Sequence, residues 1–136
     1  MPETREQYRA RETWATLTER FGEPTAWPTD ADAKPYLNAL RQSAARIHIS
    51  GLGQALVFLK TRNKDAPKRA AEDLASLVLA VMGVGIQNNA PADTLVNCIR
   101  NGDLLTLMRA TEESLAMISW LCRYLQGAGV VAEDEP

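Results

Sequence analysis

The sequence predicts an all-α fold, a single-domain bundle of five or six helices. Apolar residues recur at helical spacing along the chain, and the apolar–polar alternation of half-buried strands is absent. The 136 residues are 46% hydrophobic and 24% charged, which suits one buried core and argues against wholesale disorder. No repeat or low-complexity tract divides the chain. We therefore expect one helical domain over residues 1–126 and an acidic, flexible segment over 127–136.

Two helices are predicted in the first third of the chain. The first covers residues 3–21 and ends before Gly22, after which Pro24 and Pro28 indicate a loop. Its apolar stripe is Ala10, Trp14, Leu17 and Phe21. The second is capped by Asp30 or Asp32 and continues to residue 47. Its apolar face is Tyr36, Leu37, Leu40, Ala44 and Ile47.

Two further helices follow a break at residues 50–53. The third, over residues 52–62, is apolar nearly all round, which predicts burial on most sides. The fourth follows a polar loop at 61–67, and its inward residues are Leu74, Leu77, Val78 and Val81. Gly83 and Gly85 end it. A nucleotide-binding turn at these glycines is disfavoured, because Asn88 stands where a third glycine is required.

The last two helices begin at Pro91 and at Asp103. The fifth stops at residues 101–102, and the sixth continues to about residue 126. The main stripe of the sixth helix is Leu104, Leu107, Met108, Thr111, Leu115, Ile118, Cys122 and Leu125. A second stripe, Met117, Trp120 and Tyr124, lies on the other side. It belongs either to the core, which we favour, or to an interface with another subunit.

The sequence predicts a cytoplasmic protein with no membrane partner. It has no segment of signal-peptide type at its charged start, and its longest apolar stretch, residues 74–86, is too short to cross a bilayer. The two cysteines, Cys98 and Cys122, are far apart and fall on apolar helical faces, which suits a reducing compartment.

No catalytic residue, metal site or cofactor is predicted. His48 is the only histidine, and no cysteine or second histidine is spaced to form a metal site with it. No nucleophile–base arrangement is apparent. A helix-turn-helix around residues 49–51 is disfavoured, because the helix that would read DNA presents almost no polar side chains.

The middle of the chain is a basic belt, residues 41–69. It holds seven basic residues and one acidic residue, a net charge of +6, whereas residues 1–40 carry −2 and residues 70–136 carry −6. The belt residues are Arg41, Arg46, Lys60, Arg62, Lys64, Lys68 and Arg69. Such a cluster favours an anionic partner, and contact with nucleic-acid phosphates that reads no sequence is the functional interpretation. A solvated surface is an equal alternative for any one of these residues.

Two motifs resemble the small helical subunit of type III-B CRISPR (Cmr) RNA-targeting complexes. The first is Gly51-Leu52-Gly53-Gln54 with the apolar helix after it, and the second is the run from Met108 to Leu121. The resemblance covers about residues 3–126. It implies an all-α subunit without catalysis, present in several stacked copies beside the backbone subunits. It also implies guide RNA and target RNA as partners.

Two questions stay open at this stage. Gly51 and Gly53 either admit a phosphate or backbone closely or allow tight helix packing. The function is either that of an RNA-supporting subunit or that of a helical adaptor that binds protein only.

Overall fold

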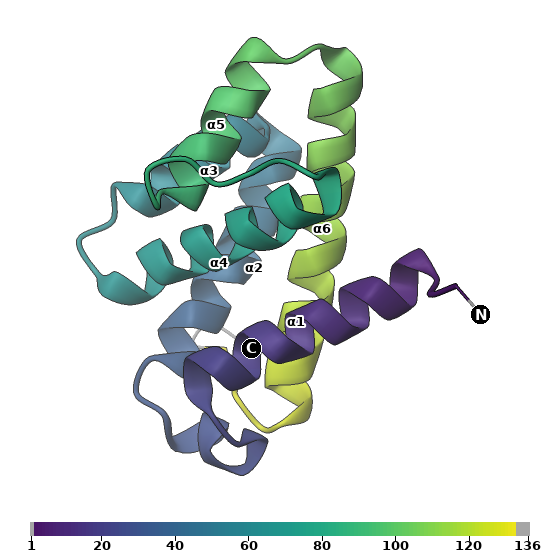
Figure 1. Cartoon of the computed structure of the whole chain (residues 1–136). Coiled ribbons are helices and arrows are strands. Elements are labelled where there is room, and N and C mark those ends of the chain that lie inside the picture. The colour runs from purple at the N-terminus through teal and green to yellow at the C-terminus, as the bar shows by residue number, and fades with distance from the viewer. Residues whose placement is uncertain (1, 133–136) are drawn as a thin grey trace.

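Local sequence signals set most of the helix boundaries. The structure, a computed structural model, describes residues 2–132, which form seven helices and no strand (Figure 1). Thr4 and Gln7 form a reciprocal cap at the start of α1, and Asp103 caps α6 by accepting from the Thr106 N–H. The helices are α1 (Arg5–Phe21), the 3-10 helix η1 (Pro24–Thr29), α2 (Ala33–Ser50), α3 (Leu52–Lys60), α4 (Asp65–Met82), α5 (Pro91–Asn101) and α6 (Leu104–Gly127).

The all-α prediction is confirmed, and the helix count is exceeded by one. Six of the helices are α-helices, and the seventh, η1, occupies the segment that the prolines predicted to be a loop. Pro24 stands in its first turn, where its missing N–H costs nothing. Trp27 is fully buried, and its Nε1 donates to the Gly22 carbonyl at 2.9 Å. Burial of this tryptophan turns the segment into a helix.

The core lies where α2, α4 and α6 meet. α2 packs against α3, α4 and α6, while α1 crosses the lower half of α6 (Figure 1). Large fully buried side chains from these helices include Tyr36, Leu40, Leu74 and Met117. The predicted inward residues of α2 and α4 are mostly buried, so the periodicity identified these two faces correctly.

The predicted stripe of α1 is shifted. The buried residues of α1 are Arg9, Thr13, Leu17 and Phe21, whereas Trp14 is 40% exposed. The reason is polar: Arg9 pairs inside the protein with Glu113 of α6, and Thr13 donates to the Arg9 carbonyl. A stripe defined by hydrophobicity misses buried positions that are charged.

Two other burial predictions are wrong in part. The outer face of α3 is open, with Val57 exposed and Phe58 half-buried, because no helix covers it. The first turns of α6 are open as well. Leu104, Leu105 and Met108 are 69%, 73% and 57% exposed, although the sequence placed Leu104 and Met108 in the main stripe.

α4 and α6 end in the same way. At α6, the Gly129 N–H donates to the Gln126 carbonyl and the Val130 N–H to the Leu125 carbonyl; Gly83 and Val84 make the equivalent bonds at α4. Both glycines have positive φ, +104° and +73°, as this helix ending requires. Beyond the predicted domain boundary at residue 126, Val130 and Ala132 are still buried. The acidic residues 133–135 lie outside the described residues, so the flexible segment remains a prediction.

Within residues 2–132, every helix is too short or too polar to span a lipid bilayer.

Candidate nucleic-acid interface

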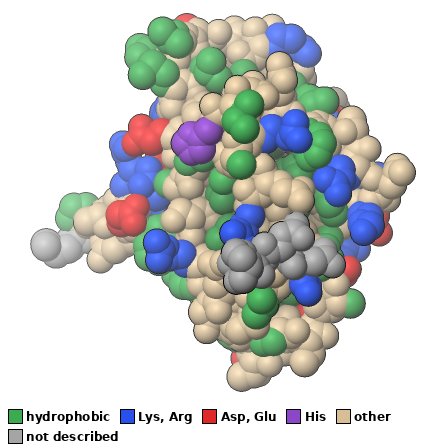
Figure 2. Space-filling model, turned by 180° about the vertical axis from the view of Figure 1, so that it is seen from behind, with side chains coloured by type: hydrophobic (Ala, Val, Ile, Leu, Met, Phe, Trp, Pro, Cys, Tyr) green, Lys and Arg blue, Asp and Glu red, His purple; other side chains and the backbone are tan. Residues whose placement is uncertain are grey.

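The exposed sides of α2 and α3 form one basic surface, which we call the α2–α3 face. Two hollows lie on it, and they share Gln42 and Ala45. One extends toward Arg41, and the other toward Arg46 and Arg62. The face consists of Arg41, Gln42, Ala45, Arg46, Phe58 and Arg62. Figure 2, a view from behind, shows Lys and Arg side chains spread over the molecule with apolar side chains between them.

Phe58 holds two of the arginines. The guanidinium carbon of Arg46 lies 3.7 Å from the centre of the Phe58 ring, and that of Arg62 lies 5.4 Å away. A guanidinium over an aromatic ring is attracted by the negative face of the ring. Arg62 also donates to the Gln42 side-chain oxygen at 3.3 Å. The stack fixes the two side chains while leaving their N–H groups available to an anion.

The structure divides the seven belt residues. Arg41, Arg46 and Arg62 meet on the α2–α3 face, whereas Lys64, Lys68 and Arg69 lie at the start of α4. Two members already have carboxylate partners: Lys60 pairs with Asp93 of α5, and Arg69 with Asp32 at 3.3 Å. Among the described residues, no carboxylate pairs with Arg46, Arg62, Lys64 or Lys68. The sequence alone did not separate these two groups.

Sequence reasoning missed an apolar groove beside the face. It lies between α3 and α5 and is lined by Gly53, Gln54, Val57, Phe58, Val96 and Ile99, together with Arg46 and Arg100. The open flank of α3 forms part of its lining. The sequence signal was present in the all-round apolar pattern of residues 52–59, which we interpreted as burial within the chain.

The glycines of the Gly51–Gln54 motif have different roles. Gly51 has φ +90° at the junction of α2 and α3, a conformation that L side chains rarely adopt, and its N–H donates to Ile47. A Cβ at Gly53 would meet Ile99 Cγ2 at 3.9 Å, an ordinary contact. Leu52 is buried and Gln54 is exposed. Tight helix packing therefore does not explain either glycine, and anion binding here remains a prediction.

The stripe Met117, Trp120 and Tyr124 binds α6 to the rest of its own chain. Met117 is fully buried, so its assignment as an interface candidate is wrong. The Tyr124 hydroxyl donates to the Ala10 carbonyl at 3.0 Å, and Trp120 Nε1 donates to Glu6 at 3.2 Å. Trp120 is only half-buried, and its contact with another subunit stays a prediction.

The first helix is attached to α6 by a buried ion pair. The Arg9 guanidinium donates twice to the Glu113 carboxylate, at 2.8 and 3.1 Å, and these residues are 8% and 2% exposed. The bonds to Glu113 raise the pKa of Arg9. Arg9 also donates to Glu6 at 2.8 Å. This pair is a structural contact between α1 and α6.

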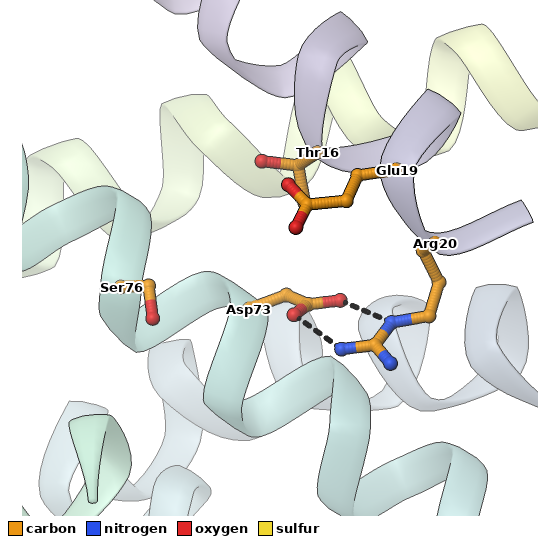
Figure 3. A pocket seen from close by; sticks show the side chains of 5 residues that line it. All are labelled: Thr16, Glu19, Arg20, Asp73 and Ser76. Atoms are coloured by element: carbon orange, nitrogen blue, oxygen red, sulfur yellow. Dashed lines mark hydrogen bonds and ion pairs between the residues drawn. The ribbon is translucent and has the colours of Figure 1, made fainter. Parts of the chain in front are cut away.

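A polar hollow between α1 and α4 is also filled by internal contacts. Figure 3 shows Arg20 pointing at Asp73, with which it makes two hydrogen bonds of 2.7 and 3.0 Å, and Thr16, Glu19 and Ser76 around them. The Tyr36 hydroxyl donates to the same carboxylate at 2.9 Å. Burial and the neighbouring Asp73 raise the pKa of Tyr36 well above its usual value.

The remaining candidate groups stand apart from one another. Residues 2–132 contain no group of three or more His, Cys, Asp or Glu side chains placed to hold a metal ion. His48 is exposed in the last turn of α2. Burial raises the pKa of the Cys122 thiol to about 11, which keeps it protonated at neutral pH.

The fold and this face together define a small all-α protein whose most distinctive surface is basic. Comparison with known proteins gives its family. The family described as CRISPR-associated protein (Cas_Cmr5) matches residues 5–128, and the chain belongs to it. The resemblance to the small Cmr subunit is thereby confirmed.

Two relatives come from Thermus thermophilus. The chain is 34% identical over 77 residues to the CRISPR system Cmr subunit Cmr5, an alignment that spans 57% of this chain and 60% of the relative. The crystal structure of a CRISPR-associated Cmr5 family protein is similar with a TM-score of 0.72 and 25% identity, covering 94% of this chain and 99% of that one. The fold of the whole domain is therefore that of the family.

Proposed function

We propose that this chain is a non-catalytic structural and RNA-binding subunit of a type III-B CRISPR ribonucleoprotein in antiviral defence. It stacks in several copies beside the backbone subunits and supports the duplex of guide RNA and target RNA in the cytoplasm. The family supplies the complex. The observation that carries RNA contact is the α2–α3 face, where Arg46 and Arg62 have no carboxylate partner among the described residues.

The arrangement of this face suits phosphate groups better than base edges. Guanidinium groups donate paired N–H bonds to phosphate oxygens, and such contacts carry no sequence information. Phe58, the aromatic residue of the face, is half-buried and already in contact with Arg46. A base has little ring surface left to stack on, so recognition of the backbone is favoured.

The test replaces the basic side chains that have no carboxylate partner. In a variant with Arg46, Arg62, Lys64 and Lys68 changed to Gln, affinity for single-stranded RNA should fall and lose most of its salt dependence. If four side chains contact phosphates, the slope of log K against log salt is about −3 for the unaltered chain. Fluorescence anisotropy over about 50 to 200 mM salt measures it.

The belt supplies its own matched control. Lys60→Gln with Arg69→Gln also removes positive charge from residues 41–69, but from side chains that already have carboxylate partners. This variant should lose less affinity per charge removed. Equal loss per charge in both variants, or an unchanged slope in the first, would contradict the site assignment.

A second candidate function is that of a helical adaptor that binds protein only. The apolar groove between α3 and α5 favours it, since Val57, Val96 and Ile99 offer hydrophobic contact area. Under this alternative, the four-glutamine variant enters the complex and supports target binding normally, whereas Val57→Asp prevents incorporation.

The proposal also requires that the purified chain does not cleave RNA, with or without divalent metal ions. Cleavage that copurifies with the chain and disappears when one carboxylate is replaced would contradict a purely structural role. Cleavage by the assembled complex does not bear on this point.

A further inference from the structure

The last described residue of the chain lies on the α2–α3 face. Ala132 is buried and lines the same hollow as Asn38, Arg41, Gln42 and Ala45 of α2. Val130, two residues earlier, is buried as well, whereas Val131 between them is exposed. The segment after α6 therefore runs against α2 and reaches the basic side chains.

The direction of this segment is fixed by its backbone. The hydrogen bonds from Gly129 to Gln126 and from Val130 to Leu125 close the end of α6 and turn the chain back. Gly129 has φ +104°, and a Cβ there would meet Pro28 Cγ at 3.2 Å. A glycine at this position allows both the turn and the close approach to η1.

The next three residues in the sequence are Glu133, Asp134 and Glu135. Three residues reach at most about 11 Å from Ala132. Arg41 borders the same hollow as Ala132, and Arg46 lies five residues further along α2, a rise of about 7.5 Å. The carboxylates are thus within reach of both arginines.

We propose that residues 133–135 occupy the α2–α3 face in the RNA-free protein and compete there with RNA phosphates. The proposal rests on the function proposed above, because it assigns that site a competitor from the same chain. Carboxylates and phosphates accept the same guanidinium hydrogen bonds, so the two anions exclude one another. RNA must displace the acidic segment, which lowers affinity for weakly held RNA.

The first measurement contains no RNA. The full chain is compared with a variant carrying Glu133→Gln, Asp134→Asn and Glu135→Gln, and the side-chain Nε–H signals of Arg41 and Arg46 are followed by NMR at low salt. The signals should move in this variant. A control carrying Glu19→Gln, Glu23→Gln and Glu112→Gln changes the net charge equally on exposed residues that do not line the face. It should leave the signals in place.

The second measurement is affinity for a short labelled single-stranded RNA. Neutralising residues 133–135 should raise affinity by about 5- to 30-fold at low salt, as expected for a few exposed ion pairs. The gain should disappear in a chain that also carries Arg41→Gln and Arg46→Gln, because the competition requires those side chains. The control on the other faces should give a much smaller gain.

The outcomes separate this inference from the proposed function. Unmoved arginine signals overturn the inference, whether or not the chain binds RNA. Moved signals together with unchanged RNA affinity, or an equal gain in the control, also overturn it. If no variant binds RNA, the proposed function fails instead, and the NMR comparison still decides whether the segment occupies the face.

Discussion

The arginines of α1 and those of the α2–α3 face differ in what the chain gives them. Arg5, Arg9, Arg11 and Arg20 each pair with a carboxylate of this chain. Arg46 and Arg62 have a phenylalanine and a glutamine around them, and no carboxylate partner among residues 2–132. The first group connects α1 to α4 and α6, whereas the second is available to an external anion. The type of residue is the same, so its neighbours decide its role.

The strongest test of this contrast is the buried pair. Glu113→Ala leaves Arg9 buried without its main partner, and the free energy of unfolding should fall by about 3–5 kcal/mol. Urea denaturation measures it. The adjacent Glu112, exposed and 3.6 Å from Arg5, is the control, and Glu112→Ala should cost at most about 1 kcal/mol. Similar losses in both variants would show that the Arg9 pair is not a structural contact.

A smaller loss is expected at Asp73. Asp73→Ala removes the acceptor for the buried Tyr36 hydroxyl and the partner of Arg20, which should cost about 1–3 kcal/mol. Asp73→Asn keeps one acceptor oxygen and should cost less. If the two variants are equally stable, the hydroxyl has found another partner.

The same cluster predicts a pH dependence. The folded state raises the pKa of Tyr36, mainly through burial, so it holds the phenolic proton more tightly than the unfolded chain. The resulting stability is present below pH 10 and declines above it, by up to about 1.4 kcal/mol per pH unit. Denaturation curves from pH 9 upward should therefore decline less steeply for Tyr36→Phe than for the unaltered protein. Parallel curves would contradict the assignment.

The smallest effect on stability is expected on the α2–α3 face. Arg46→Gln and Arg62→Gln should change the free energy of unfolding by at most about 0.5 kcal/mol, apart from the lost stack on Phe58. A loss near that of Glu113→Ala would place these arginines with those of α1. Thermal and urea unfolding of the same variants that are tested for RNA binding decide the matter.

The sequence predicted the all-α fold and the faces of α2 and α4 because their buried positions are apolar. It missed the true stripe of α1, because Arg9 is buried as an ion pair and no hydrophobic pattern reveals a pair between residues 9 and 113. It also overestimated burial at Leu104 and Met108, since periodicity locates a stripe but not the length that neighbouring helices cover.

The candidate site was predictable in composition and not in arrangement. The net charge of residues 41–69 identified the belt, but Asp93, which pairs with Lys60, lies outside that range, as does Asp32, which pairs with Arg69. Which basic residues lack such a partner depends on contacts between distant segments. Phe58 beneath Arg46 required the crossing of α2 and α3 to be known.

The stack of Arg46 on Phe58 has a thermodynamic consequence. An arginine side chain has about 2 kcal/mol of rotamer entropy, and much of it is lost here on folding, before any ligand arrives. An anion that binds Arg46 therefore restricts little further motion. A lysine in its place has no planar group to lie on the ring and would lose its freedom at the moment of binding. For Arg46→Lys, we expect a less favourable binding entropy at unchanged net charge, an effect that calorimetry can resolve.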